Sequence, residues 1–438
     1  MKQKDTHGLD LIDIFRMEEE AKEIQLGYTP SAFSLLTSEN GKVNELSPFR
    51  YPIEHFCQHA LISGGTNHGQ IPLAMKVIEA AVNTPVGPKY DEVLPGAIIL
   101  DDWKERWKGL EYGVDTERFN FIAFGKEGGD NFGLNVCAIP HGVHPGIYAQ
   151  TLAIVLAHAG GLEDGENISV ICEALLDLYE KRGILAGNYE YHAEIVTEES
   201  SAVTLTEVRR ELLERVGSDT HFNELLHEAL LPFESEDTSA SKMFSHAGGC
   251  SIDALWGKSK VFVLAIPEAN LRGFIGSCFV HGLWDFLRCH PEVFLCSNSA
   301  RGFLVLEDYG VYIDDASSPT VVTKTQEVFD QAAGYGMYVY TITNALSRLP
   351  RSVLANIGIR FAFNDCLPQS AEYFGSIWRP TSQTALAKLL CCLPLGSFLF
   401  RARSNRWREE EAPILVLPEP TAQFHFWESE KESVPDEA

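Results

Sequence analysis

The sequence predicts an α/β protein with a mostly parallel sheet and helices on both faces. Apolar strand-like runs alternate with helical periodicities, and this alternation is typical of parallel sheets. The expected strands are 97–100, 120–124, 133–139, 261–266, 303–306, 337–343 and 359–363. The expected helices among them are 271–288, 321–333 and 351–356. Apolar residues recur at helical spacing from 145 to about 231, so we expect a helical insertion before the second run of strands.

The most informative stretch is a glycine-rich turn between an apolar strand at 60–62 and an amphipathic helix. The turn consists of Gly64, Gly65, Thr66, Asn67, His68, Gly69, Gln70 and Ile71. Its glycine spacing matches the phosphate-binding P-loop pattern G-x-x-x-x-G-K-[ST]. Gln70 replaces the lysine that reaches the phosphates, and Ile71 replaces the hydroxyl residue that ligates Mg²⁺. The stretch therefore predicts a nucleotide-binding fold and argues against ordinary nucleotide hydrolysis.

Composition limits the classes of partner and compartment. The net charge of −26 argues against a broad nucleic-acid-binding surface, which needs clustered Lys and Arg, although a local basic lining is compatible with it. Ten cysteines without any C-x-x-C, after a polar and charged N-terminus, predict reduced and mostly buried thiols in a cytoplasmic protein. Cys391 and Cys392, at the end of an apolar stretch, are expected in the core. No apolar run reaches the roughly 18 residues of a membrane span, so no membrane partner is expected.

The expected organisation has five parts. Residues 1–50 form an N-terminal extension with an acidic helix at 9–24, and 51–144 form the first part of the core. Residues 145–250 form the helical insertion, with 234–249 as a loop. Residues 251–427 complete the core, and 428–438 form an acidic tail that is expected to be disordered.

The order of these pieces resembles the HerA/FtsK branch of the P-loop ATPases, the DNA-pumping ring motors. It is most similar to the short HerA-type proteins of bacteria and archaea. Five stretches carry the resemblance: 61–80, 133–143, 303–308, 333–350 and 393–418. The resemblance covers roughly 60–420 and implies a RecA/FtsK-like sheet, a helical insertion, a closing hairpin and ring assembly.

The resemblance also implies positions for catalytic residues. Glu307 and Asp308 stand in the Walker B place, where the family has an apolar strand ending in two acids. Asn344 stands where the family has a sensor glutamine and is one methylene shorter. Arg360 lies where the family places arginines near a subunit boundary, so it is either a finger acting on a neighbouring subunit or a structural ion pair.

Without the lysine and the hydroxyl residue, the turn is expected to bind an anion weakly but not to support hydrolysis. The backbone N–H groups of 65–69 and the helix N-terminus can still attract an anion, so weak binding of ATP or ADP is compatible with the sequence. Loss of the lysine removes a charge-assisted contact of roughly 1.5–3 kcal/mol. Mg²⁺ loses its direct protein ligand at residue 71, and turnover is expected to be lost.

Each motif also has a purely structural interpretation. Gly64 to Gly69 can be a strand-to-helix turn without a ligand, and Glu307 and Asp308 can merely cap a turn. Asp101 and Asp102 also end an apolar strand, where we expect a solvated strand end. No metal site is expected, because His141-x-x-His144 lies in a loop between two prolines and lacks nearby partners.

These observations favour a catalytically impaired ATPase-fold protein acting as a structural or regulatory subunit of a DNA-handling complex, such as phage defence or DNA transfer. It is expected as a homo-oligomeric ring or beside an active ATPase or nuclease, meeting DNA through the complex. One alternative is an active ATP-dependent DNA translocase or helicase-type motor with an unorthodox site. The other is an interaction scaffold that binds no nucleotide.

Overall fold

The computed structural model describes most of the chain, with gaps. The described residues are 22–30, 46–85, 94–102, 104–126, 132–184, 202–217, 219–257, 259–290, 301–308, 319–344, 346, 349–364, 383–402 and 414–418. Every structural statement below concerns these residues.

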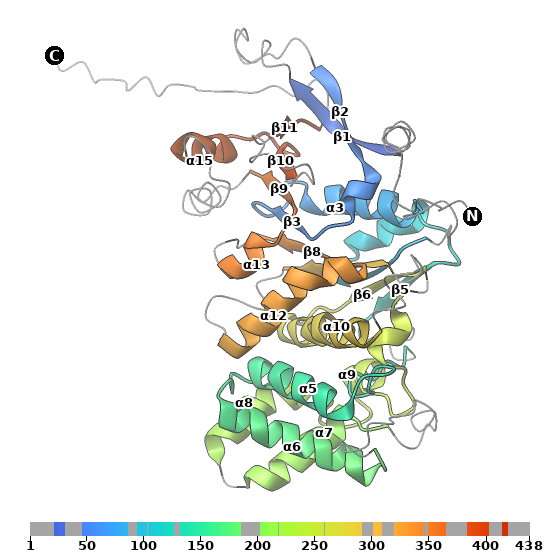
Figure 1. The fold of residues 1–438 in the computed structure, drawn as a ribbon, viewed down its shortest axis with the longest axis vertical. Helices are drawn as coiled ribbons and strands as arrows, with labels where there is room; N and C mark the ends of the chain where they lie inside the picture. The colour runs from blue at the N-terminus through green and yellow to red at the C-terminus, as the bar shows by residue number, and fades with distance from the viewer. Residues whose placement is uncertain are drawn as a thin grey trace, which may run out of the picture.

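Nine strands of the described chain form the central sheet, in the order β11-β10-β9-β3-β8-β7-β4-β6-β5 (Figure 1). Their bounds are β3 Ala60–Ser63, β4 Gly96–Asp101, β5 Phe119–Ala123, β6 Val261–Ala265, β7 Gly302–Glu307, β8 Met337–Thr343, β9 Ile359–Phe363, β10 Phe398–Ala402 and β11 Ile414–Val416. The strands from β9 to β5 are parallel, whereas β10 and β11 are antiparallel. The predicted mostly parallel sheet is confirmed, and an antiparallel pair lies where the resemblance implies a closing hairpin.

Alternating side chains of the strands build two cores, one on each face of the sheet. Leu61 and Leu100 belong to one core, and their neighbours Ile62 and Ile99 belong to the other. The first face is covered by α10 Ala269–Cys289, α12 Pro319–Gln331, η9 Ala332–Tyr335, α13 Arg351–Ala355 and α15 Gln383–Cys391. The second face is covered by η2 Ile53–Phe56, α3 Gln70–Val82 and η3 Arg106–Tyr112. Helices therefore cover both faces, as predicted.

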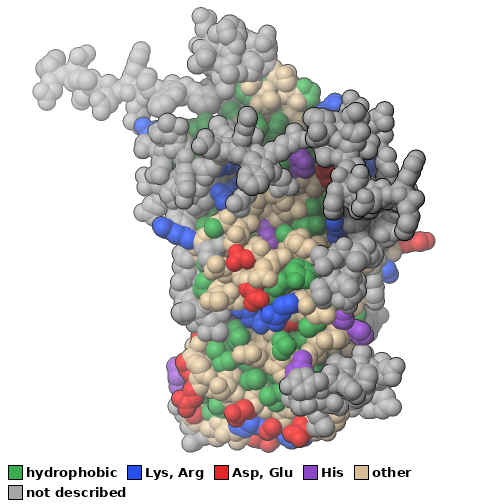
Figure 2. All heavy atoms as spheres, in the orientation of Figure 1, with side chains coloured by type: hydrophobic (Ala, Val, Ile, Leu, Met, Phe, Trp, Pro, Cys, Tyr) green, Lys and Arg blue, Asp and Glu red, His purple; other side chains and the backbone are tan. Residues whose placement is uncertain are grey.

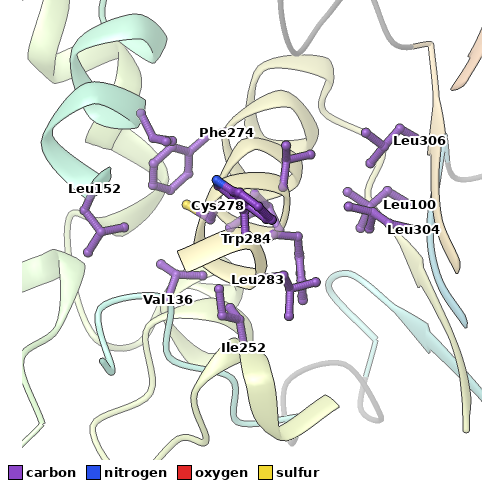
Figure 3. Close-up of a cluster of buried hydrophobic side chains, with 14 of the residues drawn as sticks. Leu100, Val136, Leu152, Ile252, Phe274, Cys278, Leu283, Trp284, Leu304 and Leu306 are labelled. Atoms are coloured by element: carbon purple, nitrogen blue, oxygen red, sulfur yellow. The ribbon is translucent and has the colours of Figure 1, made fainter. Parts of the chain in front are cut away.

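The region 145–250 is helical and packs on α10 rather than directly on the sheet. It contains α5 Pro145–Ala159, α6 Gly165–Lys181, α7 Leu205–Val216, α8 Thr220–Leu230, η5 Leu231–Phe233 and α9 Ser239–Phe244, followed by η6 Ile252–Leu255. In Figure 1, α5 to α8 gather at one end of the molecule. Figure 3 shows α10 between Leu152 of α5 and the strand residues Leu100 and Leu304. The insertion and the sheet thus share one hydrophobic core; the predicted domain bounds stay a prediction.

One expected strand and one expected loop differ from the structure. Residues 133–139 form turns with isolated bridges instead of a strand. The Asn135 side chain explains this, because its Oδ1 accepts from Cys137 N at 2.9 Å and its Nδ2 donates to Val203 O at 2.9 Å, favouring a turn over a ladder. The expected loop 234–249 contains α9, which Thr238 caps by accepting from Ser241 N at 3.1 Å.

The N-terminal prediction is wrong where it can be examined. Residues 9–21 of the expected helix lie outside the described residues, but Glu23 and Ile24 are in a strand. This strand, β1 Glu23–Pro30, pairs antiparallel with β2 Leu46–Pro52. Ile24 and Leu26 are buried against the second core, so tertiary packing decides the strand. The acidic tail 428–438 lies outside the described residues.

Cysteine burial is also lower than expected. The described cysteines are free thiols; Cys137 and Cys278 are buried, whereas Cys250 is exposed. Cys391 is half-buried and Cys392 exposed, because α15 ends there and the chain turns to the surface. None of the described helices has the length and apolar character needed to span a bilayer.

Candidate functional site

The glycine turn lies where predicted, between β3 and the start of α3 at Gln70. Gly64 and Gly69 have φ of 150° and 112°, which side chains rarely adopt. A Cβ at Gly64 would lie 2.6 Å from Cβ of Phe363, and one at Gly69 would lie 3.1 Å from the Phe363 ring. Close packing against β9 therefore accounts for both glycines without a ligand.

Neighbouring elements hold the turn in place. Gly64 N donates to Thr343 O of β8 at 3.3 Å, and Gly65 N donates to Asn364 O after β9 at 2.7 Å. On the other side, Gly396 N donates to His68 O at 3.1 Å. The turn is thus fixed to two strands and to the turn that precedes β10.

The Gln70 side chain closes the turn from inside. Its Nε2 donates to Gly65 O at 2.5 Å, and its Oε1 accepts from His68 N at 3.1 Å. Only 7% of Gln70 is exposed. In a functioning P-loop the backbone N–H groups cradle the phosphates. Here Gln70 itself occupies the His68 N–H.

Ile71 offers nothing to a metal ion. It is buried in the core on the α3 side of the sheet and carries no oxygen. Thr66 and Asn67, at the tip of the turn, are exposed. Asn67 has φ of 65°, a left-handed conformation that Asn tolerates.

The second part of the site is a group of acids at the ends of two adjacent strands. Glu307 ends β7 and Asp101 ends β4, and these strands pair in parallel. Oxygens of Asp101, Asp102 and Glu307 all lie within 4.8 Å of one another. Asp102 N donates to Glu307 Oε2 at 3.1 Å. The expected solvated strand end is wrong for Asp101, which is fully buried, because β7 brings Glu307 beside it.

One arginine pairs with part of this acidic group. Arg106 forms ion pairs with Glu307 and, at 3.0 Å, with Asp102 Oδ2. Burial raises the pKa of Glu307 to about 8, and the neighbouring Asp101 carboxyl adds to the rise. Burial likewise raises the pKa of Asp101. Burial therefore disfavours the charged form of both carboxyls.

The turn and the acids share the carboxyl edge of the sheet. β8 lies between β3 and β7, and the register places Ser63 beside Thr343 and Glu307 beside Ile342. Two strand spacings separate the turn from Glu307, roughly 10 Å. In open parallel sheets ligands bind at this edge, so the turn and the acids lie where a ligand is expected.

Of the other predicted site residues, some lie at the same edge of the sheet and one does not. Asn344 directly follows β8 at the same edge and is exposed. Asp308 is half-buried and has φ of 57°, and its carboxylate lies 3.9 Å from the buried Arg272 guanidinium. Arg360 pairs with Leu61, three residues before Gly64, and therefore lies roughly 10 Å back along the strand. Its guanidinium donates to Leu354 O at 2.8 Å, so within one chain it does not join the site.

Comparisons with solved structures decide the fold. VirB4 of Thermoanaerobacter pseudethanolicus is similar with a TM-score of 0.58 at 13% identity, over 82% of this chain and 88% of that one. The unbound bacterial conjugative coupling protein TrwB has a TM-score of 0.53 at 13% identity, over 92% and 95%. TrwB in complex with ADP and Mg²⁺ has a TM-score of 0.54 at 15% identity, over 92% and 96%. The chain has the fold of the FtsK/HerA-like P-loop ATPases. By sequence alone, no family model and no curated protein matches it.

The FtsK/HerA-like fold confirms the resemblance as a statement about architecture. The residue roles that the resemblance implies for Glu307, Asp308, Asn344 and Arg360 stay predictions. Sequence reasoning missed Arg106, which follows an expected strand by a few residues and shows no pattern of its own. The available signal was that two apolar strands each end in a pair of acids, but their adjacency depends on the strand order.

Proposed function

We propose that the protein is a catalytically impaired subunit with an FtsK/HerA-like ATPase fold, with a structural or regulatory role in a DNA-handling complex. The observation that carries the proposal is the closure of the glycine turn by Gln70, together with the burial of Ile71. The position that would neutralise phosphate charge instead holds an amide bonded to its own turn. The position that would ligate Mg²⁺ holds a core side chain.

These changes remove two groups that bind and neutralise the phosphates during phosphoryl transfer. Catalysis of that reaction depends on positioning and on neutralising charge on the phosphates. The missing lysine contact alone is worth roughly 1.5–3 kcal/mol. The His68 N–H is also bonded to Gln70. A nucleotide can use this N–H only after the Gln70 side chain has left the turn, which breaks both of its hydrogen bonds. Weak binding of ATP or ADP without turnover is the expected behaviour.

The similar structures suggest in which DNA-handling process the subunit acts. TrwB is a plasmid coupling protein that binds ADP and Mg²⁺, so a role in DNA transfer suits the same fold. A role in phage defence is equally compatible with the impaired site. On the face shown in Figure 2, basic and acidic side chains are interspersed over the described surface. This face is therefore not a broad basic surface, and with a net charge of −26 we expect contact with DNA through an assembled ring, an active ATPase or a nuclease.

Glu307 supports a second candidate, an active motor with an unorthodox site. It ends a buried strand at the edge where the turn lies, and its raised pKa marks an environment typical of functional carboxylates. The nucleotide-free scaffold is the third candidate, supported by the packing explanation of Gly64 and Gly69.

Calorimetric titration of the purified protein with ATP and ADP, with and without Mg²⁺, tests the proposal. The proposed subunit gives weak, saturable binding and unchanged nucleotide after incubation. Absence of any saturable binding supports the scaffold instead. Consumption of ATP during the titration supports the motor and contradicts the proposal.

A further inference from the structure

Helix α12, which lies beside α10 in Figure 1, is joined to α10 and α5 by buried charged groups. Asp285 of α10 is fully buried and accepts hydrogen bonds from the Thr151 hydroxyl of α5 and, at 3.2 Å, from Arg288. Lys324 of α12 is only 17% exposed. It donates to the same Thr151 hydroxyl at 2.6 Å, and its Nζ lies 3.9 Å from Asp285 Oδ2. Three helices therefore meet at a buried chain of lysine, threonine and aspartate that the proposed function does not use.

The burial of these charges weakens the docking of α12. Burial raises the pKa of Asp285 although Lys324 and Arg288 lie beside it. Burial likewise lowers the pKa of Lys324 although Asp285 lies beside it. Both directions mean that the loss of hydration outweighs the attraction between the charges. His281, one turn before Asp285, adds a buried Nδ1 without a hydrogen-bond partner among the described residues, and its Nε2 lies 3.4 Å from the Thr325 hydroxyl of α12.

The apolar anchors of α12 lie in its C-terminal half. Val328 and Phe329 are buried there in the core that α12 shares with α10. Nearer the N-terminus of the helix, Lys324 and Thr325 face the junction, and the apolar Val322 is only half-buried. Apolar burial supplies most of the packing energy, so within the described part of α12 the N-terminal half is held less firmly.

We propose that the N-terminal half of α12 is a movable element, kept ready to separate from α5 and α10 by the buried charges of Asp285 and Lys324. Along the chain, α12 follows β7, which ends at Glu307, and precedes β8. Separation of α12 is therefore expected to loosen the end of β7 while the sheet stays intact. The charged junction then acts as a conformational switch between the helical insertion and the carboxyl edge of the sheet. This inference goes beyond the proposed function and stands whether or not nucleotide binds.

Hydrogen–deuterium exchange of the full chain, followed by mass spectrometry of overlapping peptic fragments, tests the movable element. In the unmodified protein we expect the amides of 322–327 to exchange faster than those of α10. The double variant Asp285→Leu/Lys324→Met should slow exchange in α12 about 5-fold or more, because apolar side chains of similar size avoid the desolvation penalty. Asp285→Leu alone leaves Lys324 without its carboxylate and should speed this exchange at least about tenfold.

The other polar groups of the junction keep partners in the double variant. The Thr151 hydroxyl can donate to Ile147 O, which lies at 3.1 Å in the structure. Arg288 pairs with Glu327 of α12 at 3.2 Å. The double change therefore removes the two buried charges without leaving these groups unpaired.

The matched control is Glu211→Leu/Lys181→Met. It makes the same change of charge at a 2.6 Å ion pair between α7 and α6, in which the Lys181 side chain is 61% exposed. We expect this control to leave exchange in α12 unchanged, because a solvated ion pair contributes little.

Three results would overturn the movable element. Faster or unchanged exchange of α12 in Asp285→Leu/Lys324→Met would show that the buried charges do not weaken its docking. An equal slowing in Glu211→Leu/Lys181→Met would show a general effect of the charge change. Exchange of 322–327 no faster than that of α10 in the unmodified protein would show that α12 is held as firmly as the core. This last comparison decides even if a variant does not fold.

Discussion

Replacing Gln70 tests whether its side chain obstructs the turn. In the structure it makes two hydrogen bonds to the turn, to Gly65 O and from His68 N. At about 1 kcal/mol each, their loss to an incoming phosphate opposes binding by about 2 kcal/mol, or about 30-fold in Kd. Gln70→Ala removes that competition, so we expect ADP affinity to rise by up to about 30-fold. Gln70→Lys adds a charge-assisted contact, for a further rise of about 10- to 150-fold.

Calorimetric titration with ADP without Mg²⁺ measures both effects, because the missing hydroxyl at Ile71 then plays no part. Gln58→Lys is the matched control, since Gln58 also donates to a backbone carbonyl, at 3.0 Å to His55 O, but lies outside the turn. It makes the same charge change and is expected to leave the ADP affinity unchanged. Equal affinity of Gln70→Ala and the unmodified protein would refute the obstruction. A gain in Gln58→Lys as large as that in Gln70→Lys would show a general charge effect.

Three further predictions concern stability. Burial lowers the pKa of His59 from 6.5 to about 4, and its Nδ1 accepts from Val339 N. The contribution of His59 to the free energy of unfolding should therefore be complete above pH 6.5 and fall by about 3 kcal/mol as the pH falls towards 4. Urea melts of His59→Gln at several pH values should lack this slope. An equal slope in the variant would contradict the assignment of the pH dependence to His59. Leu152→Ala should cost about 2–5 kcal/mol in a single thermal transition, since the insertion and sheet share a core; two transitions would contradict that. Thr204→Ala removes the capping box with Glu207 and should cost about 1 kcal/mol, whereas the exposed Thr66→Ala should not.

The fold could be predicted because its strands are continuous buried runs and its helices are amphipathic. Strand β7 and helix α10 appear within two residues of their expected bounds, since burial on both faces leaves little choice of residue type. The N-terminal strand β1 could not be predicted. Its burial pattern is irregular, and it depends on contact with β2 and β11, which no local pattern encodes.

The site could be predicted in part. The glycine turn and the loss of its lysine and hydroxyl depend on consecutive residues, so the sequence shows them directly. The bonding of Gln70 to its own turn depends on a side-chain conformation, which the sequence does not show. Asp101 and Glu307 lie 206 positions apart in the numbering and meet only because β4 and β7 are neighbours. Strand order thus determines the acidic group, and a sequence pattern predicts strands far better than their order.

The most direct test of the central claim is steady-state ATP hydrolysis by the unmodified protein with Mg²⁺, in the presence and absence of DNA. Glu307→Gln serves as the background control, because it removes the acid that any residual activity would use. We expect the two proteins to release phosphate at the same background rate. Mg²⁺-dependent release by the unmodified protein, lost in Glu307→Gln, would contradict the inference from Gln70 and Ile71.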